Sequence, residues 1–501
     1  MAPRLIAVKS HRFPIPPAVL VVVSLILATG GMTSGRDRAA QAQAQPQQEA
    51  DSLAALLQNN SFREARKKAD AILLRRPTDP ELKAVCGLAI LKMGRIAEAE
   101  TVFHDVLSRS PDNAEAHLGL GRIGRIRNNP ETAIAHLRRA VRSDLFYEEA
   151  LYQSWRAAME QGIVADLDEI YTQAKERFGR KEKPIPDWIG NGRSVLLEFP
   201  VKKLYAMEGR FERISLPLVQ VSNGPGRMIR LRLNDKEEYP FHIDSAAPDF
   251  LTVSPLLAKD LGLREIGSST ALGVGSGASA AVRFTMLDSV EAGSVTFRNV
   301  PVMVSDLYTF RGEKIGLIGT GLLKRFNCTI DAPAGKMDLF PLDRPDMLEA
   351  NIARTAVAAE VPLYLFDATM VEASVDGAPQ GLFILDSAAA THLVDSAYFL
   401  EFIKPAIEPD QITPSGIQGA LGPQKVNRIS DLSIKLGSST FSHQVAHEFS
   451  FAAMSAITGR YAAGLLGNPI LWPYRVHFNF RAGKLILEKP PQSSGAQRSP
   501  K

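Results

Sequence analysis

One short sequence motif occurs twice in the second half of the chain and constrains the fold more than any other feature. The first copy, residues 241–247, reads FHIDSAA, and the second, residues 383–389, reads FILDSAA. Each pattern is typical of a buried apolar strand that leads an aspartate, Asp244 or Asp386, into a tight turn of small residues. The chain therefore contains two matching strand-and-turn units, each with one carboxylate at the turn.

The repetition extends well beyond this motif. Residues 318–339 align without a gap with residues 466–487, and upstream of the aspartates residues 216–218 match residues 361–363. Roughly 130 residues therefore occur twice, which indicates an internal duplication of a β-rich unit. Within each copy, alternating apolar residues and a turn signal, Asn234-Asp235 or Asp376-Gly377, precede the aspartate strand.

The duplication suggests a use for the two aspartates. A pseudo-twofold axis between the copies would bring Asp244 and Asp386 together at their interface. Two adjacent carboxylates share one proton, so that one can accept a proton from water while the other protonates a carbonyl or a departing amine. The alternative is that both aspartates only cap turns, since Asp-Ser is common in turns. The matched block downstream of each aspartate favours the paired site.

On these residues the segment from about 211 to 489 resembles the aspartic proteases, in the two-lobed single-chain form with retropepsin-like halves. The resemblance implies an all-β, bilobed pepsin/retropepsin-like fold and aspartic-type endopeptidase activity, with Asp244 and Asp386 as the catalytic pair. It also implies roles for the hydroxyl residues that cross-link the two turns and for the glycines of the strands that brace them, which are Ser245, Ser387, Gly319 and Gly467.

The resemblance further implies a flap over the substrate in each lobe. Glycine-bearing hairpin candidates lie between each aspartate strand and its bracing strand, and glycine hinges suit a moving lid. They contain Gly273, Gly275 and Gly277 in the first lobe, and Gly419 and Gly422 in the second.

No cofactor or metal is expected. His443 and His447 lie on a predicted strand, about 13 Å apart at the usual rise, so we interpret them as structural.

One departure from the family pattern leaves an alternative open. The glycine of the family's Asp-Thr/Ser-Gly triplet is replaced by Ala246 and Ala388, and alanine restricts both the backbone conformation and close approach. The competing hypotheses are a weak or inactive pseudoprotease that binds peptides, and a scaffold protein in which the helical part described next performs the biological work.

The first part of the chain has a helical repeat pattern. Ala65, Ala99 and Ala133 are spaced by 34 residues, the tetratricopeptide period. Residues 46–178 resemble a tetratricopeptide solenoid, whose concave face usually binds a peptide or protein. A charged, proline-bearing linker is expected over 179–195, followed by lobe one over 196–342, lobe two over 343–490 and a disordered tail over 491–501.

The N-terminus predicts export. Residues 1–30 contain basic residues, a short apolar run from Ala18 to Ala28 and small residues for cleavage, which is typical of a signal peptide. The run is short for a membrane span of about 20 residues, although an uncleaved anchor stays an alternative. A disordered linker is expected over 31–45. We therefore expect a periplasmic or secreted protein, in contact with a membrane only if the leader is retained.

Composition excludes some classes of protein. The formal net charge is +4, and three of the basic residues lie in the predicted leader, so nothing indicates nucleic-acid binding. The two cysteines, Cys86 and Cys328, fall in different predicted domains, so we expect buried free thiols rather than a disulfide framework.

Overall fold

The computed structural model describes residues 35–220, 226–247, 251–271, 280–307, 310 and 312–491. The chain divides after Pro46 into two units, and a helix that begins at Gly35 crosses the division. The second unit, Gln47–Lys501, contains the helical repeat and both lobes. The leader predicted over 1–30 and all but the first residue of the tail predicted over 491–501 lie outside the described residues. Among the residues that are described, no helix has the length and apolar character needed to span a membrane.

Antiparallel helix pairs form the first part of the chain, as the 34-residue period predicts. They are α1 (Gly35–Gln58), α2 (Phe62–Arg75), α3 (Pro80–Lys92), α4 (Ile96–Arg109), α5 (Ala114–Ile126), α6 (Pro130–Ala140), α7 (Tyr147–Gln161) and α8 (Val164–Arg180). The repeated small residues lie where helices cross. A Cβ atom on Gly87 would lie 2.6 Å from the ring of Phe103, and one on Gly121 would lie 2.5 Å from Leu137.

Two predicted linkers are helical instead. Helix α1 begins at Gly35, within the segment expected to be disordered over 31–45, because its alanine and glutamine residues favour a helix. In the linker predicted over 179–195, α8 continues to Arg180 and α9 occupies Asp187–Glu198. Ile189, Val195 and Leu196 of α9 are buried, so the tertiary packing of an apolar face stabilises this helix.

The remainder of the chain is mainly β-structure with short helices. Lobe one contains β1 (Ala206–Glu208), β2 (Ile214–Pro217), β3 (Val219–Gln220), β4 (Arg227–Leu233), β5 (Glu238–Ile243), β6 (Leu251–Val253), α10 (Pro255–Leu261), β7 (Ile266–Ala271), β8 (Ala280–Ala292), β9 (Val295–Ser305), β10 (Gly316–Ile318), α11 (Thr320–Leu323), β11 (Phe326–Asp331) and β12 (Lys336–Pro341). The connection to lobe two contains the expected short helix, α12 (Pro345–Glu349). Lobe two contains β13 (Val357–Leu365), β14 (Thr369–Val375), β15 (Gly381–Leu385), β16 (His392–Asp395), α13 (Ser396–Tyr398), β17 (Ile412–Gly419), β18 (Gly422–Leu436), β19 (Ser439–Phe449), α14 (Ala452–Thr458), β20 (Gly464–Leu466), β21 (Arg475–Asn479) and β22 (Lys484–Glu488).

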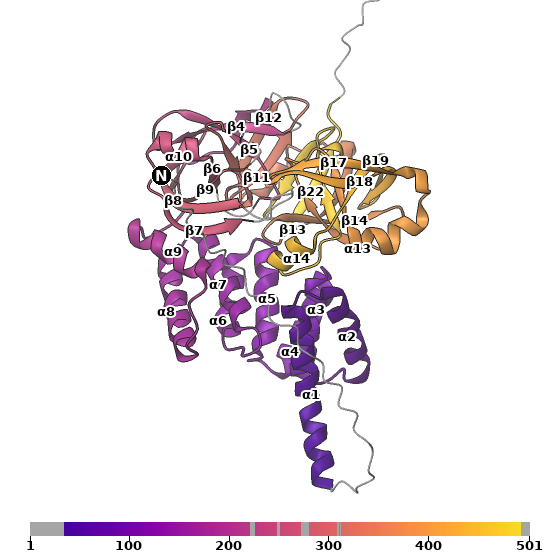
Figure 1. Ribbon diagram of the computed structural model, residues 1–501. Coiled ribbons are helices and arrows are strands. Elements are labelled where there is room, and N and C mark those ends of the chain that lie inside the picture. The colour runs from indigo at the N-terminus through magenta and orange to yellow at the C-terminus, as the bar shows by residue number, and fades with distance from the viewer. Residues whose placement is uncertain are drawn as a thin grey trace, which may run out of the picture. The chain divides into compact units, whose positions relative to one another are not determined.

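Figure 1 shows the two lobes side by side, with lobe one mainly pink and lobe two orange to yellow. The two lobes repeat one topology and share a sheet: in lobe one β10 lies between β5 and β6, and in lobe two β20 lies between β15 and β16. Strand β11 of lobe one pairs with β21 of lobe two, with Cys328 opposite Phe478, so that one sheet continues across both lobes. The turns predicted at Asn234-Asp235 and Asp376-Gly377 are present, and all four residues have a positive φ. The predicted combination of a helical repeat and a bilobed all-β fold is confirmed, and both cysteines are free and buried.

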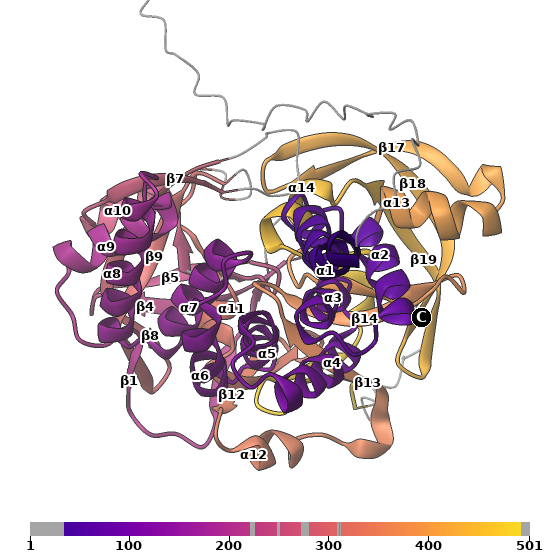
Figure 2. The ribbon, with the colours of Figure 1, turned by 90° about the horizontal axis from the view of Figure 1, so that it is seen from below.

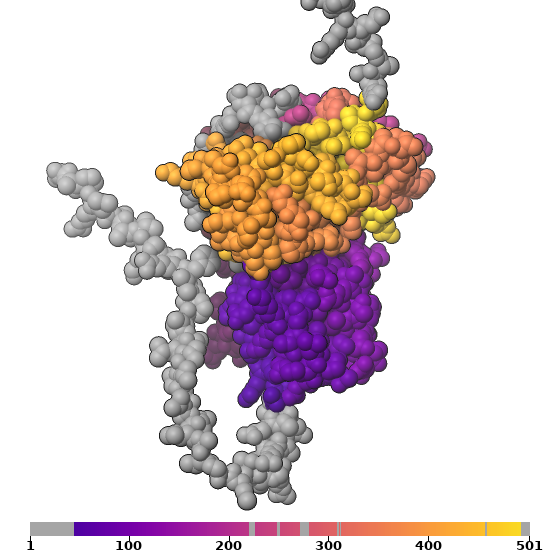
Figure 3. Space-filling model, turned by 90° about the vertical axis from the view of Figure 1, so that its right-hand side faces the viewer, coloured from indigo at the N-terminus to yellow at the C-terminus, as the bar shows by residue number. Residues whose placement is uncertain are grey.

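In Figure 2, which is seen from below, helices α2 to α7 form an arc in front of the lobes. In the space-filling view of Figure 3 the indigo and violet helical part lies directly against the orange strands of lobe two. A single apolar core contains residues of α3 and α5 together with Met370, Leu382 and Ile384 of lobe two. The backbone N–H of Tyr461 also donates to Lys92 O at the end of α3, at 2.9 Å. The repeat helices that would be expected to bind a partner are therefore covered in part by the chain's own lobe.

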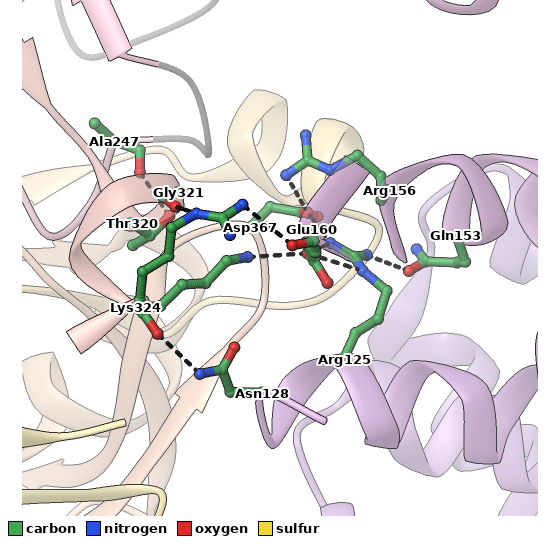
Figure 4. Close-up of polar contacts among 11 residues, drawn as sticks. Arg125, Asn128, Gln153, Arg156, Glu160, Ala247, Thr320, Gly321, Lys324 and Asp367 are labelled. Carbon is green, nitrogen blue, oxygen red and sulfur yellow. Dashed lines mark hydrogen bonds and ion pairs between the residues drawn. The ribbon is translucent and has the colours of Figure 1, made fainter. Parts of the chain in front are cut away.

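A buried network of charges joins the helical part to both lobes (Figure 4). One Glu160 oxygen lies 2.7 Å from Arg125 Nη2 and 3.1 Å from Lys324 Nζ, which belongs to lobe one. Arg125 also lies 3.0 Å from Asp367 Oδ1, in the turn between β13 and β14 of lobe two. Arg156 lies 3.0 Å from the same Asp367 oxygen. The side chains of Arg125, Glu160 and Lys324 are each less than one-tenth exposed. The helical part thus contacts both lobes through one set of ion pairs.

Candidate active site

Asp244 and Asp386 each follow directly on a buried strand that pairs in parallel with a bracing strand. Strand β5 pairs with β10, with Ile243 opposite Ile318, and β15 pairs with β20 in the same register. The N–H of Asp244 donates to Ile318 O at 3.1 Å, and that of Asp386 donates to Leu466 O at 2.9 Å. An equivalent pair of strands therefore positions the aspartate in each lobe, as the duplication predicts.

Two serines join the aspartate turns across the pseudo-twofold axis. Ser245 Oγ donates to Leu385 O at 2.6 Å and accepts the N–H of Ser387 at 3.0 Å. In return Ser387 Oγ donates to Ile243 O at 2.8 Å and accepts the N–H of Ser245 at 3.0 Å. Both side chains are buried, so water does not compete for these four bonds. The predicted cross-linking serines thus bring the two aspartate turns together.

The environment of the pair favours a retained proton. Burial raises the pKa of Asp244, and the negative charge of Asp386 raises it further, while hydrogen bonds from the backbone N–H groups of Ala246 and Ala247 oppose the shift. Burial likewise raises the pKa of Asp386. Because the two carboxyls interact, their protons are lost in two steps that belong to the pair. A form with one proton on the pair therefore persists toward higher pH than for isolated aspartates.

Close packing behind each turn explains the glycines of the bracing strands. A Cβ atom on Gly467 would lie 2.4 Å from Thr391 O and 2.7 Å from Ala389 O, so no side chain fits between these carbonyls. Gly319, which follows β10, has nearly the same φ and ψ angles as Gly467, which follows β20.

One residue at the aspartate turns, Thr369, could not be identified from the sequence. Thr369 Oγ1 lies 2.8 Å from Ser245 O and 3.0 Å from Leu385 O, so its one proton is donated to one of these two carbonyl oxygens or shared between them. Thr369 has no counterpart motif in lobe one that would have singled it out.

A second missed feature repeats in both lobes. A Cβ atom on Gly316 of β10 would lie 2.1 Å from the ring of Phe241, and one on Gly464 of β20 would lie 2.7 Å from the ring of Phe383. Each aspartate strand therefore packs a phenylalanine on a glycine of its bracing strand. The signal was present, since these residues occupy equivalent positions in the two copies of the duplication.

In lobe two a hairpin lies where the sequence predicts a flap. Strands β17 and β18 form a long hairpin that closes with Gly419 opposite Gly422, the predicted glycines of lobe two. In lobe one β7 and β8 pair as far as Ala271 and Ala280, and Gly273, Gly275 and Gly277 lie outside the described residues.

The two histidines and the two alanines have simple surroundings. His443 contacts Asp431 at 2.6 Å and His447 contacts Thr391 at 3.1 Å, so the two rings have separate partners. Neither Ala246 nor Ala388 has a positive φ, and the N–H of each donates to the carboxylate of its own turn, at 2.9 and 2.8 Å. The concern that alanine restricts the turn backbone is therefore wrong, and only the space taken by the methyl groups is left.

Comparison with known families matches this geometry. A family model described as aspartyl protease matches residues 229–322, and one described as tetratricopeptide repeat matches residues 85–148. The chain contains an aspartic protease-like domain and a tetratricopeptide-repeat region. The aspartyl protease match includes Asp244 and Gly319 but ends before lobe two. Asp386 and Gly467 are related to it through the internal duplication and the shared strand order.

Three similar solved structures are matched over almost their whole length, but with low sequence identity and low TM-scores. The basic 7S globulin from soybean is 10% identical with a TM-score of 0.34, and the match covers 56% of this chain and 98% of that chain. The aspartic proteinase from Irpex lacteus is 11% identical with a TM-score of 0.33, and the match covers 56% of this chain and 99% of that chain. Conglutin gamma from lupine seeds is 8% identical with a TM-score of 0.35, and the match covers 56% of this chain and 96% of that chain. The comparison with curated proteins found no match.

Proposed function

We propose that this protein is an exported aspartic endopeptidase that uses Asp244 and Asp386 to activate water for peptide-bond hydrolysis. The observation that carries the proposal is the reciprocal bonding of Ser245 and Ser387, which joins the two turns that carry the half-buried, interacting carboxyls of Asp244 and Asp386. Export rests on the signal-like sequence of residues 1–30.

The proposed reaction needs one proton shared by the pair. The ionised carboxylate accepts a proton from the water as its oxygen attacks the peptide carbonyl, and the protonated carboxyl donates to the carbonyl oxygen. Proton transfer to the amide nitrogen then allows the carbon–nitrogen bond to break, which releases an amine and an acid. The raised pKa values of Asp244 and Asp386 support this scheme, because they keep a proton on the pair.

The helical region has a structural part in this proposal. Contacts from α3 and α5 to lobe two, and ion pairs from Glu160 and Arg125 to both lobes, support a role in holding the lobes around the dyad. A protein partner, which tetratricopeptide repeats suggest, would then bind surfaces that lobe two leaves exposed.

A pseudoprotease is the second candidate, and the methyl groups of Ala246 and Ala388 favour it, since the related pattern has glycine there. Incubation of the full chain with a peptide library, with and without the transition-state analogue pepstatin, tests both. Cleavage that pepstatin inhibits supports the protease. Tight pepstatin binding without cleavage supports the pseudoprotease. If the chain neither binds pepstatin nor cleaves any peptide, both candidate functions are contradicted.

The pH dependence follows from the direction of the pKa shifts. Burial raises the pKa of both aspartates, and the side chains of Ala247 and Ala389 provide no hydroxyl that could lower the pKa values again. The singly protonated pair therefore persists toward neutral pH. We expect a bell-shaped profile of kcat/KM with its maximum at roughly pH 5 to 7.

A pair of substitutions tests the cause of this pH dependence. Ala247→Ser with Ala389→Ser adds two donors to the ionised form and should move the maximum toward acid. A wild-type maximum near pH 2 to 3, as in pepsin, would contradict the argument.

A further inference from the structure

The carboxylate of Asp244 takes its position from the backbone of its own turn. The N–H groups of Ala246 and Ala247 donate to Asp244 Oδ1, at 2.9 and 3.0 Å. A movement of the turn therefore moves the carboxylate, and a misplacement of about 1 Å can lower a reaction rate about 10²-fold. The residues that hold the carbonyl groups of this turn thus affect the geometry of the aspartate pair.

Helix α11 holds one of these carbonyl groups and is itself held by the helical region (Figure 4). Thr320, the first residue of α11, bonds Ala247 O through its backbone N–H at 3.3 Å and through its hydroxyl at 3.1 Å. Lys324 follows directly on α11, and its backbone O accepts a hydrogen bond from Asn128 Nδ2 at 3.1 Å. Asn128 lies in the turn after α5, so the short helix connects α5 to the Asp244 turn.

Arg325 forms a second connection between α11 and the helical region. Its Nε donates to Gly321 O of α11 at 3.1 Å, and its Nη2 donates to Glu160 O near the end of α7, also at 3.1 Å. The guanidinium lies 4.0 Å from the centroid of the Tyr205 ring, which limits its movement. Because a guanidinium carries several donors in a fixed plane, it can hold both carbonyl groups at once.

The same two helices are connected to the turn from the side of lobe two. Asp367 has ion pairs with Arg125 of α5 and Arg156 of α7, each at 3.0 Å. Two residues further along the chain, the N–H of Thr369 donates to Ser245 O at 3.0 Å, and the hydroxyl of Thr369 lies 2.8 Å from the same oxygen. Two carbonyl groups of the Asp244 turn are therefore bonded by segments that contact the helical region.

We propose that the helical region positions the Asp244 turn, with Asn128 and Arg325 as positioning residues that act through α11. Neither residue bonds the aspartates, but both fix the helix whose first residue bonds the turn. The inference rests on the proposed use of Asp244 in catalysis and adds that the helical region contributes to activity. The position of the turn can also be measured without any assay of cleavage.

Asn128→Gly removes the donor to Lys324 with little effect on the local backbone. Asn128 has a φ of 53°, which glycine adopts without strain. Asn60→Gly is the matched control, because Asn60 lies two 34-residue periods earlier, in the turn between α1 and α2, with a φ of 60°. Among the described residues, no hydrogen bond joins the Asn60 side chain to either lobe.

Hydrogen–deuterium exchange of the full-length protein, followed by mass spectrometry of its peptides, measures the turn directly. In Asn128→Gly the N–H groups of residues 241–247 should exchange about threefold faster or more, because their segment opens more readily. Residues 383–389 are the comparison within the same molecule, since the N–H of Asn468 bonds Ala389 O there at 2.8 Å. They should change less, and Asn60→Gly should leave both segments as in the wild type.

Steady-state kinetics measure the consequence for the proposed reaction. Asn128→Gly should lower kcat roughly three- to tenfold and leave KM within about twofold, since it displaces a reacting carboxyl without removing a contact to substrate. Arg325→Lys should lower kcat at least as much, because one ammonium group does not reproduce the planar set of donors. Asn60→Gly should retain the wild-type kcat.

Unchanged exchange of residues 241–247 in Asn128→Gly, or an equal increase in Asn60→Gly, would overturn the proposed positioning. A wild-type kcat in Asn128→Gly, despite faster exchange, would overturn the contribution to activity. If the wild type cleaves no peptide, the proposed protease function fails, and the exchange results still decide whether the helical region positions the turn.

Discussion

Asp386→Asn and Asp244→Asn are each expected to abolish peptide cleavage, with a loss in kcat/KM of about 10²- to 10⁴-fold or more. Each substitution removes the shared proton and leaves a single carboxyl that cannot serve as both acid and base. Because the two aspartates act as a unit, the double variant should be no less active than either single variant. Initial rates on a fluorogenic peptide, chosen from those that the wild type cleaves, measure the effect.

Stability provides the control for these variants. In the wild type the folded pair has raised pKa values, above the ordinary value of about 3.9. The folded state therefore binds more protons than the unfolded state in this range, and stability falls as the pH rises from that value through the folded pKa values. Asparagine removes this loss at its own position, so each variant should be at least as stable as the wild type at neutral pH. Thermal unfolding of the wild type and both variants at several pH values tests this expectation about stability. In the activity assay, a folded Asp→Asn variant that retains full activity would contradict the dyad mechanism.

Glu160→Gln is expected to lower the free energy of unfolding by about 3–5 kcal/mol, the usual cost of breaking a buried ion pair from one side. The substitution leaves Arg125 and Lys324, both less than one-tenth exposed, around a neutral amide. Arg125 keeps its ion pair with Asp367, but Lys324 loses its ion pair with Glu160. Denaturation by urea, followed by circular dichroism, measures the change.

A matched ion pair on the surface shows what burial contributes. Glu100 bonds both Nη atoms of Arg127, at 2.5 and 2.6 Å, but the two side chains are 26% and 49% exposed. Glu100→Gln should therefore lower stability by less than about 1 kcal/mol. Equal effects of Glu160→Gln and Glu100→Gln would mean that the buried network does not stabilise the contact between the helical region and the lobes.

Much of the candidate site could be predicted because its residues lie close to a repeated local pattern. Asp244 and Ser245, and their counterparts in lobe two, lie in closely similar strand-and-turn sequences, and the gapless match of their downstream blocks locates Gly319 and Gly467. Thr369 could not be predicted in this way, since it has no equivalent motif in lobe one. Helix α9 was mistaken for a linker because its charged and proline-bearing surroundings hide a buried face that only packing reveals.

The helical repeat, the duplicated β-unit and the residues of the aspartate pair could all be predicted, because they follow from patterns of period 2, 3.6 or 34 residues and from a unit of roughly 130 residues that occurs twice. Which surfaces cover one another could not be predicted and is seen in the three-dimensional structure. The contact of Arg125 with Asp367 joins residues 242 positions apart, and apolar residues of α3 and α5 share a core with Met370, Leu382 and Ile384 of lobe two. A periodic pattern shows which face of an element is apolar but does not show which distant element will cover that face.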